Sequence, residues 1–359
     1  MTTDRVIRSY YAIAGTYTLA ASSIWGVNTL FLLEAGLDIF EAFIANAAFT
    51  VGSVIFEIPT GVLADTRGRR VSFLLSVAIL FLTTLAYVAV SWFGGGVVWF
   101  CVVSIFVGLG FTFYSGAVDA WLVDALVASG HEGPLDGIFA RGSMVTGTAM
   151  LVGSIGGGVL GSIDLSLPYL LRSVVLLAVF VLAWFGMHDM GFAPRTLSLA
   201  GIPTEMRKVA ADSIKHGVGI LPLRLLMGIC FVQWGFLMWA WYAWQPYFLE
   251  LWGSGDAVWV AGVISAAMSV SMIIGNSLVE RLTRVCGRRS TLMGYAVAVQ
   301  VVAAVCVGLA PNFWLAVSAF LVMIGTVGVM GPVRSACIHQ LIDGRHRASV
   351  ASLDSMAGN

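Results

Sequence analysis

Three acids and one base stand inside long apolar stretches of this sequence. The acids are Glu57, Asp119 and Asp124, and the base, Arg141, belongs to the apolar stretch that follows them. Ionisable groups surrounded by hydrocarbon are rare and costly, and they mark ion or substrate pathways or buried ion pairs. We therefore regard Glu57 and Asp119 as candidates to carry a proton, with Arg141 as the base that balances one of them. The alternative is a structural ion network in which Arg141 pairs with Glu57 or Asp119.

A second group of charges lies between two apolar stretches, in the segment Gly61–Arg70, which reads GVLADTRGRR. A charged segment this short between hydrocarbon-length stretches predicts a loop at a membrane surface. Three of its four charges are arginines, which favours the cytoplasmic surface. The glycines Gly61 and Gly68 allow close backbone approach. Asp65 is placed to face a helix N-terminus, and Arg69 can reach a second carboxylate.

This segment resembles the signature of the major facilitator superfamily, Gly-x-Leu-Ala-Asp-x-x-Gly-Arg-Arg/Lys, which joins helices 2 and 3 in that family. Every fixed position matches, including Arg70 at the last one. In the family the signature arginine pairs with an acid at the cytoplasmic end of helix 4, and the aspartate faces the N-terminus of helix 11. The resemblance therefore implies that Arg69 pairs with Asp124 and that Asp65 faces the segment from Ala348. It also implies that this cluster latches two halves of a transporter together on the inside while the protein is open outward.

The composition is that of a membrane protein. Of the 359 residues 59% are hydrophobic and 11% are charged, with a mean hydropathy of +0.92, a balance that a bundle of membrane helices requires. The lipid bilayer is thus the first expected partner. The 19 basic and 19 acidic residues cancel, which gives no reason to expect a nucleic-acid partner. The five cysteines lack metal-ligand spacing and the five histidines lack a catalytic motif, so no cofactor and no enzymatic activity are predicted.

Windows of about 20 apolar residues predict ten membrane-spanning helices. They lie near residues 10–33, 41–63, 71–93, 97–124, 137–161, 168–190, 221–249, 257–282, 290–310 and 313–338. An eleventh begins near Ala348 and the sequence stops at Asn359, so we expect a chain that is truncated at its C-terminus. The basic residues gather at the N-terminus and around the loops after the even-numbered spans, with Arg172 as the exception. This asymmetry predicts a cytoplasmic N-terminus.

A polar interval, residues 191–220, divides the chain into an N-terminal part, 1–190, and a C-terminal part, 221–359. The segment Leu278–Ser290, after the eighth span, echoes the signature after the second span, which indicates two parallel repeats. The family resemblance implies an all-α integral membrane fold of two pseudo-symmetric six-helix bundles, joined by a cytoplasmic linker at 191–220. The second bundle is incomplete here, with helices 7–10 and the start of helix 11.

Aromatic and amide side chains within the spans are candidates to line a cavity for a flat or lipophilic substrate. The candidates are Tyr17, Asn28, Tyr114, Gln233, Trp241 and Gln245. For each of them helix packing is the alternative, and aromatic residues near helix ends also form interfacial belts. Arg172, on the opposite side of the membrane from the other basic residues, is expected to snorkel or to pair with Asp164.

The direction of transport has one weak indicator. Residues 149–158, AMLVGSIGGG, resemble the antiporter signature Gly-x-x-x-Gly-Pro-x-x-Gly-Gly, with Ala149 for the first glycine and Ser154 for the proline. Small residues at this spacing also serve helix packing, so export and packing remain alternative explanations. The arginine usual in the middle of helix 4 of proton-driven drug exporters is absent from Phe106–Tyr114, which moves the expected coupling site to the two acids named first.

These patterns predict a monomeric secondary transporter in the cell membrane that couples the export of a small lipophilic compound to protons. Two alternatives are a proton-coupled uptake symporter of a small metabolite and a transport-inactive receptor or scaffold on the same fold. Acids inside the spans favour coupled transport, because a scaffold has no need of them.

Overall fold

The computed structural model describes residues 2–114, 117–133, 135–191, 221–255 and 257–341. In these residues the chain is entirely helical, with thirteen helices and no strand, which confirms the predicted all-α class. The chain divides into two compact units, Met1–Met206 and Arg207–Asn359, and this division falls inside the polar interval 191–220. The helix expected from Ala348 lies outside the described residues.

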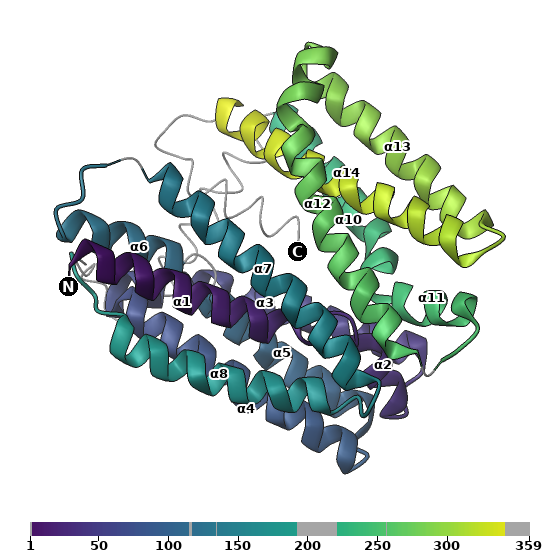
Figure 1. The fold of residues 1–359 in the computed structure, drawn as a ribbon, viewed down its shortest axis with the longest axis horizontal. Coiled ribbons are helices and arrows are strands. Elements are labelled where there is room, and N and C mark those ends of the chain that lie inside the picture. Colours follow the sequence, from purple (N-terminus) through teal and green to yellow (C-terminus); the bar gives the residue numbers. More distant parts are fainter. Residues whose placement is uncertain (1, 115–116, 134, 192–220, 256, 342–359) are drawn as a thin grey trace. The chain divides into compact units, whose positions relative to one another are not determined.

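Eight of these helices belong to the N-terminal unit and five to the C-terminal unit (Figure 1). The first eight are α1 (Thr3–Ser22), α2 (Asn28–Glu34), α3 (Ile39–Arg67), α4 (Arg69–Trp92), α5 (Gly96–Tyr114), α6 (Ala117–Ala128), α7 (Asp136–Gly161) and α8 (Leu167–Gly186). The other five are α10 (Leu221–Tyr242), α11 (Trp244–Trp252), α12 (Val258–Cys286), α13 (Arg289–Leu309) and α14 (Phe313–Leu341). In the N-terminal unit α1 packs against α7 and α8, and α5 packs against α3 and α4; in the C-terminal unit α14 packs against α12 and α13.

Eight spans in the described part of the chain are long and apolar enough to cross a membrane. They coincide with the second to sixth and the eighth to tenth predicted spans. The first and seventh are not among them: residues 10–33 are divided between α1 and α2, and residues 221–249 between α10 and α11. The predicted number of ten spans is therefore not confirmed.

The ends of the helices follow from local chemistry. Asp38 begins α3 with a capping box, in which its side chain accepts a hydrogen bond from Glu41 N at 2.8 Å and the Glu41 carboxylate accepts one from Asp38 N at 3.0 Å. α3 ends before Gly68, where the backbone turns with φ of 102°, and α4 starts at the next residue. A residue with a Cβ is strained at such a φ, so the sharp connection between α3 and α4 depends on glycine.

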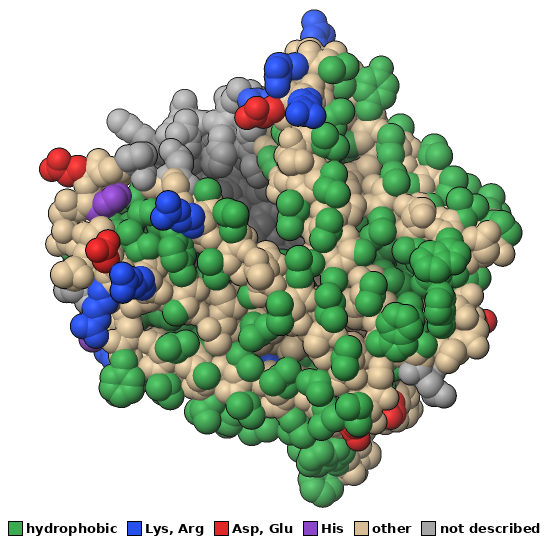
Figure 2. Space-filling model, in the orientation of Figure 1, with side chains coloured by type: hydrophobic (Ala, Val, Ile, Leu, Met, Phe, Trp, Pro, Cys, Tyr) green, Lys and Arg blue, Asp and Glu red, His purple; other side chains and the backbone are tan. Residues whose placement is uncertain are grey.

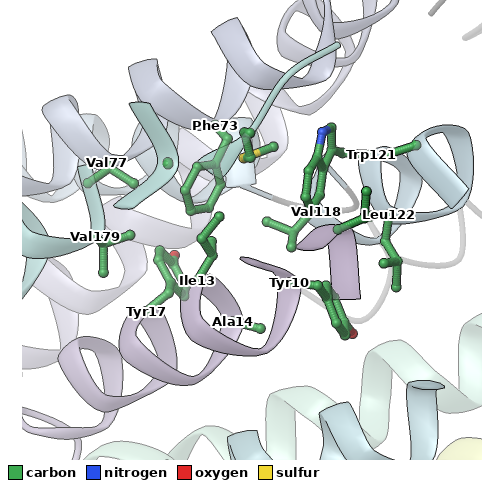
Figure 3. Packing of buried hydrophobic residues seen from close by; sticks show 14 of the residues in the cluster. Tyr10, Ile13, Ala14, Tyr17, Phe73, Val77, Val118, Trp121, Leu122 and Val179 are labelled. Atoms are coloured by element: carbon green, nitrogen blue, oxygen red, sulfur yellow. The ribbon is translucent and has the colours of Figure 1, made fainter. Parts of the chain in front are cut away.

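The core of the N-terminal unit is built on one face of α1. Tyr10, Ile13 and Tyr17 follow one another at helical spacing, and all three are buried. Figure 3 shows them among side chains of α4, α6 and α8. The neighbours labelled there are Phe73 and Val77 of α4, Val118, Trp121 and Leu122 of α6, and Val179 of α8. This packing fixes the rotation of α1 about its axis, and with it the direction of every polar side chain that α1 carries.

Large apolar side chains also lie on the outside of both units. Phe93, Ile163 and Phe231 are each more than 70% exposed. On the face seen in Figure 2, hydrophobic side chains cover the middle of the helices and charged side chains gather near their ends. A soluble protein rarely exposes so much apolar surface, whereas helices that face lipid must do so.

Glycines bring helices of each unit into backbone contact. A Cβ at Gly108 of α5 would lie 2.6 Å from Ser53 N of α3, and a Cβ at Gly328 of α14 would lie 3.0 Å from Met272 Cα of α12. Small residues at such crossings let membrane helices approach closely. Because each pair consists of the second and fourth predicted spans of its half, the same contact occurs in both units, in keeping with two parallel repeats.

The glycines of the antiporter-like segment 149–158 have a similar packing role. A Cβ at Gly153 would lie 2.8 Å from Leu19 O of α1, and a Cβ at Gly157 would lie 2.7 Å from the carbonyl carbon of Ser23. Both glycines therefore allow α7 to pack directly on α1. Packing accounts for them without reference to the direction of transport.

Replacement of Gly157 by alanine should loosen the contact between α7 and α1, since the added methyl group overlaps the backbone of Ser23. We expect the variant to lose about 1–3 kcal/mol of stability and to melt at a lower temperature in detergent. Gly156→Ala is the matched control, because a Cβ there meets nothing within 4 Å and alanine favours a helix by about 1 kcal/mol. Equal melting temperatures of the two variants would contradict this packing role.

Candidate functional site

The signature loop, residues 61–70, turns at Gly68 between α3 and α4. Across this turn Arg69 Nη2 lies 2.8 Å from Asp65 Oδ1, and the two side chains form an ion pair. The turn brings these residues together, so Arg69 binds the acid of its own loop, and its expected pair with Asp124 is not formed among the described residues. A Cβ at Gly61 would meet no atom within 4 Å, so the close approach expected there is not observed. The segment expected to face Asp65 lies outside the described residues.

The end of the signature docks onto the end of α8. Arg70 N donates a hydrogen bond to Asp189 Oδ1 at 2.9 Å, and Arg70 Nη2 donates one to Trp184 O at 2.8 Å. The Arg70 guanidinium also lies over the Trp184 ring, 5.1 Å from its centre. Gly68 leaves room for the carboxylate, because a Cβ there would lie 2.9 Å from Asp189 Cγ. Asp189 thus caps α4 from outside the helix.

The role of Asp189 was missed by reasoning from the sequence. The signal that points to it is position. It is the one acid between Asp164 and Glu205, and it stands at the end of the predicted span 168–190, on the predicted cytoplasmic side. Sequence spacing alone cannot pair it with Arg70, which lies 119 residues earlier.

The short segment after α8 ties α4, α6 and α8 together. Trp121 Nε1 of α6 donates a hydrogen bond to His188 O at 2.8 Å, next to the Asp189 cap. A Cβ at Gly191 would lie 3.0 Å from Asp124 O, so the end of this segment packs on the backbone of α6. Asp124 is half-buried at that position. The signature loop and Asp124 therefore belong to one cluster at one end of the N-terminal unit, although no direct ion pair joins them.

The three coupling candidates do not form an ion network within the described residues. Tyr10 OH donates a hydrogen bond to Asp119 Oδ1 at 3.1 Å, which links α6 to α1. The Glu57 side chain is half-buried in α3 and neither hydrogen-bonds nor pairs with a described residue. Arg141 lies on the exposed surface of α7. Its expected pairing with Glu57 or Asp119 is therefore not found, because Arg141 is outside the packed interior in which such a pair would form.

The cavity candidates of the N-terminal unit fall into two groups. Tyr17 of α1 and Tyr114 of α5 stack on each other, with ring centres 3.8 Å apart and planes inclined by 9°. Asn28 belongs to a polar chain: its Nδ2 donates to Asn46 Oδ1 at 3.0 Å, and its Oδ1 accepts a hydrogen bond from Tyr169 OH at 2.8 Å. Both groups consist of residue types that recognise flat and polar ligands, and both also hold helices together.

The cavity candidates of the C-terminal unit lie on α10 and α11. Gln233 Nε2 donates a hydrogen bond to Gln300 Oε1 at 2.7 Å. Trp241 stacks with Trp234, with ring centres 6.2 Å apart, and its buried Nε1 has no hydrogen-bond partner among the described residues. Gln245 is buried in α11. Gln233 and Trp241 therefore keep polar atoms inside the unit, as candidates for ligand contacts must.

Arg172 neither snorkels nor pairs with Asp164. Only 8% of Arg172 is exposed, so its charged end is held inside the N-terminal unit. Asp164 is occupied elsewhere, because its Oδ1 accepts a hydrogen bond from Ser166 N at 2.7 Å at the start of α8. Arg172 is therefore enclosed by the helices of the N-terminal unit and does not extend along their surface.

An open groove of about 570 Å³ lies between α1 and α7 of the N-terminal unit. Residues that line it include Tyr11, Gly15, Thr16, Met144 and Thr148. None of the six cavity candidates lines this groove, so it adds a mainly apolar surface that the sequence did not indicate.

The family follows from comparison with known sequences. The sequence model of the Major Facilitator Superfamily matches residues 11–359. The chain belongs to this superfamily. Its members are transporters and not enzymes. The chain is a multi-pass membrane protein, with eight candidate membrane spans in its described residues.

Individual relatives are distant. The chain is 25% identical over 177 residues to the uncharacterized MFS-type transporter YxaM of Bacillus subtilis (strain 168), and the alignment covers 49% of this chain but only 41% of that protein. Among solved structures, the nucleoside transporter NupG has a TM-score of 0.77 at 11% identity, over 99% of this chain and 87% of its own. A D-xylose-proton symporter has a TM-score of 0.65 at 15% identity, over 99% and 86%. At these identities the likeness to solved structures shows the fold alone.

Loss of the Asp189 cap should weaken the N-terminal unit. Asp189→Ala removes the acceptor of Arg70 N, and a lost helix cap costs about 0.5–2 kcal/mol, which should lower the melting temperature of the purified protein. Asp189→Asn retains an oxygen that can accept the same hydrogen bond and should lose less. If the alanine and asparagine variants both melt at the wild-type temperature, Asp189 does not cap α4.

Proposed function

We propose that the protein is a monomeric, proton-coupled exporter of a small lipophilic compound in the cell membrane, with a cytoplasmic N-terminus. The observation that carries the coupling is Glu57, a half-buried carboxylate in a membrane-spanning helix that has no partner among the described residues. Such a group can take up a proton when water reaches it and carry that proton when water is excluded. Repeated once per transport cycle, this step couples the movement of protons to the movement of substrate.

The backbone around Glu57 supports a segment that changes its surroundings. Pro59 lies inside α3 and has no N–H, so the carbonyl of Ile55 loses its helical hydrogen bond. In the same turn, Thr60 Oγ1 donates hydrogen bonds to the carbonyls of Phe56 and Glu57, at 2.8 and 3.1 Å. Helices bend at interruptions of this kind. A bend beside the carboxylate would let it meet different environments in the two states of the cycle.

Asp119 is the second candidate to carry the proton. It accepts a hydrogen bond from Tyr10 of α1, so protonation of Asp119 would weaken the contact between α6 and α1. Arg141 remains a candidate to attract one of the two acids in another state of the cycle, since its exposed side chain is not bound to any described acid.

We further propose that the signature loop and Asp124 form a conformational latch. The Asp65–Arg69 pair is a quarter to a third exposed, so it can exchange partners at little cost. Arg70, by contrast, is fixed to the end of α8 through Asp189 and Trp184. Because Arg70 is fixed and the Asp65–Arg69 pair is exchangeable, Asp65 can change partners while the loop keeps its shape. This combination supports a latch.

The substrate class and direction rest on the cavity candidates and on the antiporter-like segment. The Tyr17–Tyr114 stack and the Gln233–Gln300 pair suit a flat compound with a polar group. Uptake by symport is the alternative, because the glycines of residues 149–158 already have a packing role. The two directions differ in the pH gradient that drives accumulation.

Export predicts that inverted membrane vesicles with an acidified lumen accumulate at least one member of a panel of fluorescent aromatic compounds, neutral, cationic and anionic. Glu57→Gln or Asp119→Asn should abolish the gradient-driven accumulation and retain downhill exchange, because only proton carriage is lost. Glu132→Gln, at an exposed acid outside the helices, is the control and should behave as wild type. Accumulation only in right-side-out vesicles with acid outside would replace export by uptake. Full gradient-driven accumulation by both single variants would place the coupling acid elsewhere.

The proposed orientation predicts which loops an impermeant thiol reagent reaches in intact cells. In a chain whose own cysteines are replaced by serine, Phe93→Cys and Gly255→Cys should react from outside. Both positions are exposed and follow helices α4 and α11, at the ends predicted to face outward. Thr66→Cys, in the signature loop, should react only after the cells are opened. Reaction of Thr66→Cys in intact cells would reverse the topology.

A further inference from the structure

Arg172 is a buried cation without a protein partner in the described part of the chain. It lies on α8, near the end opposite the signature loop, and is 8% exposed. Its Nε is fully enclosed without a hydrogen-bond partner, and no carboxylate of the described residues pairs with it. The exposure that Arg172 retains therefore belongs to other atoms of the residue. Because an arginine stays charged inside a protein, this position keeps a positive charge among the membrane helices.

Three tyrosines are close enough to Arg172 to interact with it electrostatically, Tyr17, Tyr87 and Tyr169. The hydroxyl of Tyr169 donates its proton to Asn28, and that of Tyr87 is hydrogen-bonded to Ser104. These neutral groups screen the cation only in part. None of the tyrosines is a counter-ion.

Aromatic rings surround these three tyrosines. Tyr169 packs against Phe31, with ring centres 4.3 Å apart, and stacks with Tyr87 at 6.0 Å. Tyr17 stacks with Tyr114. The rings come from α1, α2, α4, α5 and α8, so the site is assembled from most of the unit. It combines one buried positive charge with neighbouring flat aromatic rings.

A charge in this position costs free energy as long as it has no partner, and that cost falls when an anion binds. A guanidinium is planar and presents parallel N–H groups, which match the two oxygens of a carboxylate. The neighbouring rings match a flat hydrocarbon group attached to that carboxylate. We propose that Arg172 binds the carboxylate of an aromatic monoanion, the substrate class of this transporter. This inference rests on the proposed transport function and deepens it.

The test is binding to the purified full chain in detergent, measured by calorimetry and by thermal shift, with benzoate as the probe. Benzamide has nearly the same shape without the charge, and nitrate has a planar delocalised charge without the ring. We expect benzoate to bind and to raise the melting temperature, and benzamide and nitrate to bind at least roughly tenfold more weakly, as follows from the loss of a charge-assisted hydrogen bond or of the ring contacts. Equal binding of benzoate and benzamide would overturn the role of the charge. Equal binding of benzoate and nitrate would overturn the aromatic class.

Variants assign the effect to Arg172. Arg172→Gln should lose benzoate binding, and without ligand it should melt no lower than wild type, because it removes a buried charge that has no partner. Arg172→Lys keeps the charge without the planar fork and should bind benzoate more weakly while still preferring it to benzamide. Arg8→Gln makes the same change at an exposed arginine of the same unit and should leave binding intact. Unchanged benzoate binding by Arg172→Gln, or a large drop in its melting temperature without ligand, would make Arg172 a structural residue.

This binding assay needs no ion gradient, so it separates the two proposals. Selective benzoate binding together with an absence of any gradient-driven transport would count against the proposed function and leave the anion site standing. Gradient-driven accumulation of only neutral or cationic compounds, without benzoate binding, would remove the anion site and leave proton-coupled transport standing.

Discussion

The hydrocarbon core of a membrane contains no water, so each polar group there must find its partner within the protein. The helices meet this condition for the backbone, and the side chains meet it largely by local means. Thr83 and Thr84 of α4 both donate hydrogen bonds to carbonyls one turn earlier. Ser76 instead reaches the carbonyl of Gly110 on α5, and Ser72 that of Phe113. These hydroxyls help hold α4 against α5 in a medium that gives apolar side chains little reason to associate.

The same constraint explains why most charged side chains lie near the ends of the helices, where they also join one helix to another. At the signature end, Arg70 is bound by a carbonyl, a carboxylate and an aromatic ring, all supplied by the end of α8 and the segment after it. The indole of Trp121 joins α6 to the same segment. The ends of α4, α6 and α8 are therefore joined by direct contacts. A displacement of one of these helices would strain its contacts with the other two.

Glu57 and Arg172 are two charges in helices of the N-terminal unit for which the described residues supply no counter-ion. Proteins keep such groups inside membrane helices when they act on ions or substrates. Their signs are opposite, as a transporter that exchanges or joins a proton and an anion would need. Both proposals made for this protein thus derive from one physical principle, the cost of a charge that the protein leaves unpaired.

Glycine packing links these sites to the rest of the fold. The contacts at Gly108 and Gly157 bring α5 onto α3 and α7 onto α1 at backbone distance. Helices in such close contact constrain each other's position. The position of Glu57 on α3 and of Tyr10 on α1 is therefore tied to the helices that pack on them.

The sequence by itself determined the membrane class, eight of the spans, the signature loop and its family, because these depend on composition, length and local spacing. It also marked Glu57, Asp119 and Arg172 as unusual, since a charge in an apolar stretch is visible in one dimension. Only the tertiary structure decided the partners. In the structure Arg69 pairs with Asp65, Asp119 accepts a hydrogen bond from Tyr10, and Arg70 donates one to Asp189. Arg172 is buried near Tyr17 and Tyr87 of other helices and Tyr169 of its own helix. The physical reason is that a partner depends on how each helix is rotated about its axis, which is fixed by close contacts such as Gly157 on Ser23 and is not encoded in any local pattern.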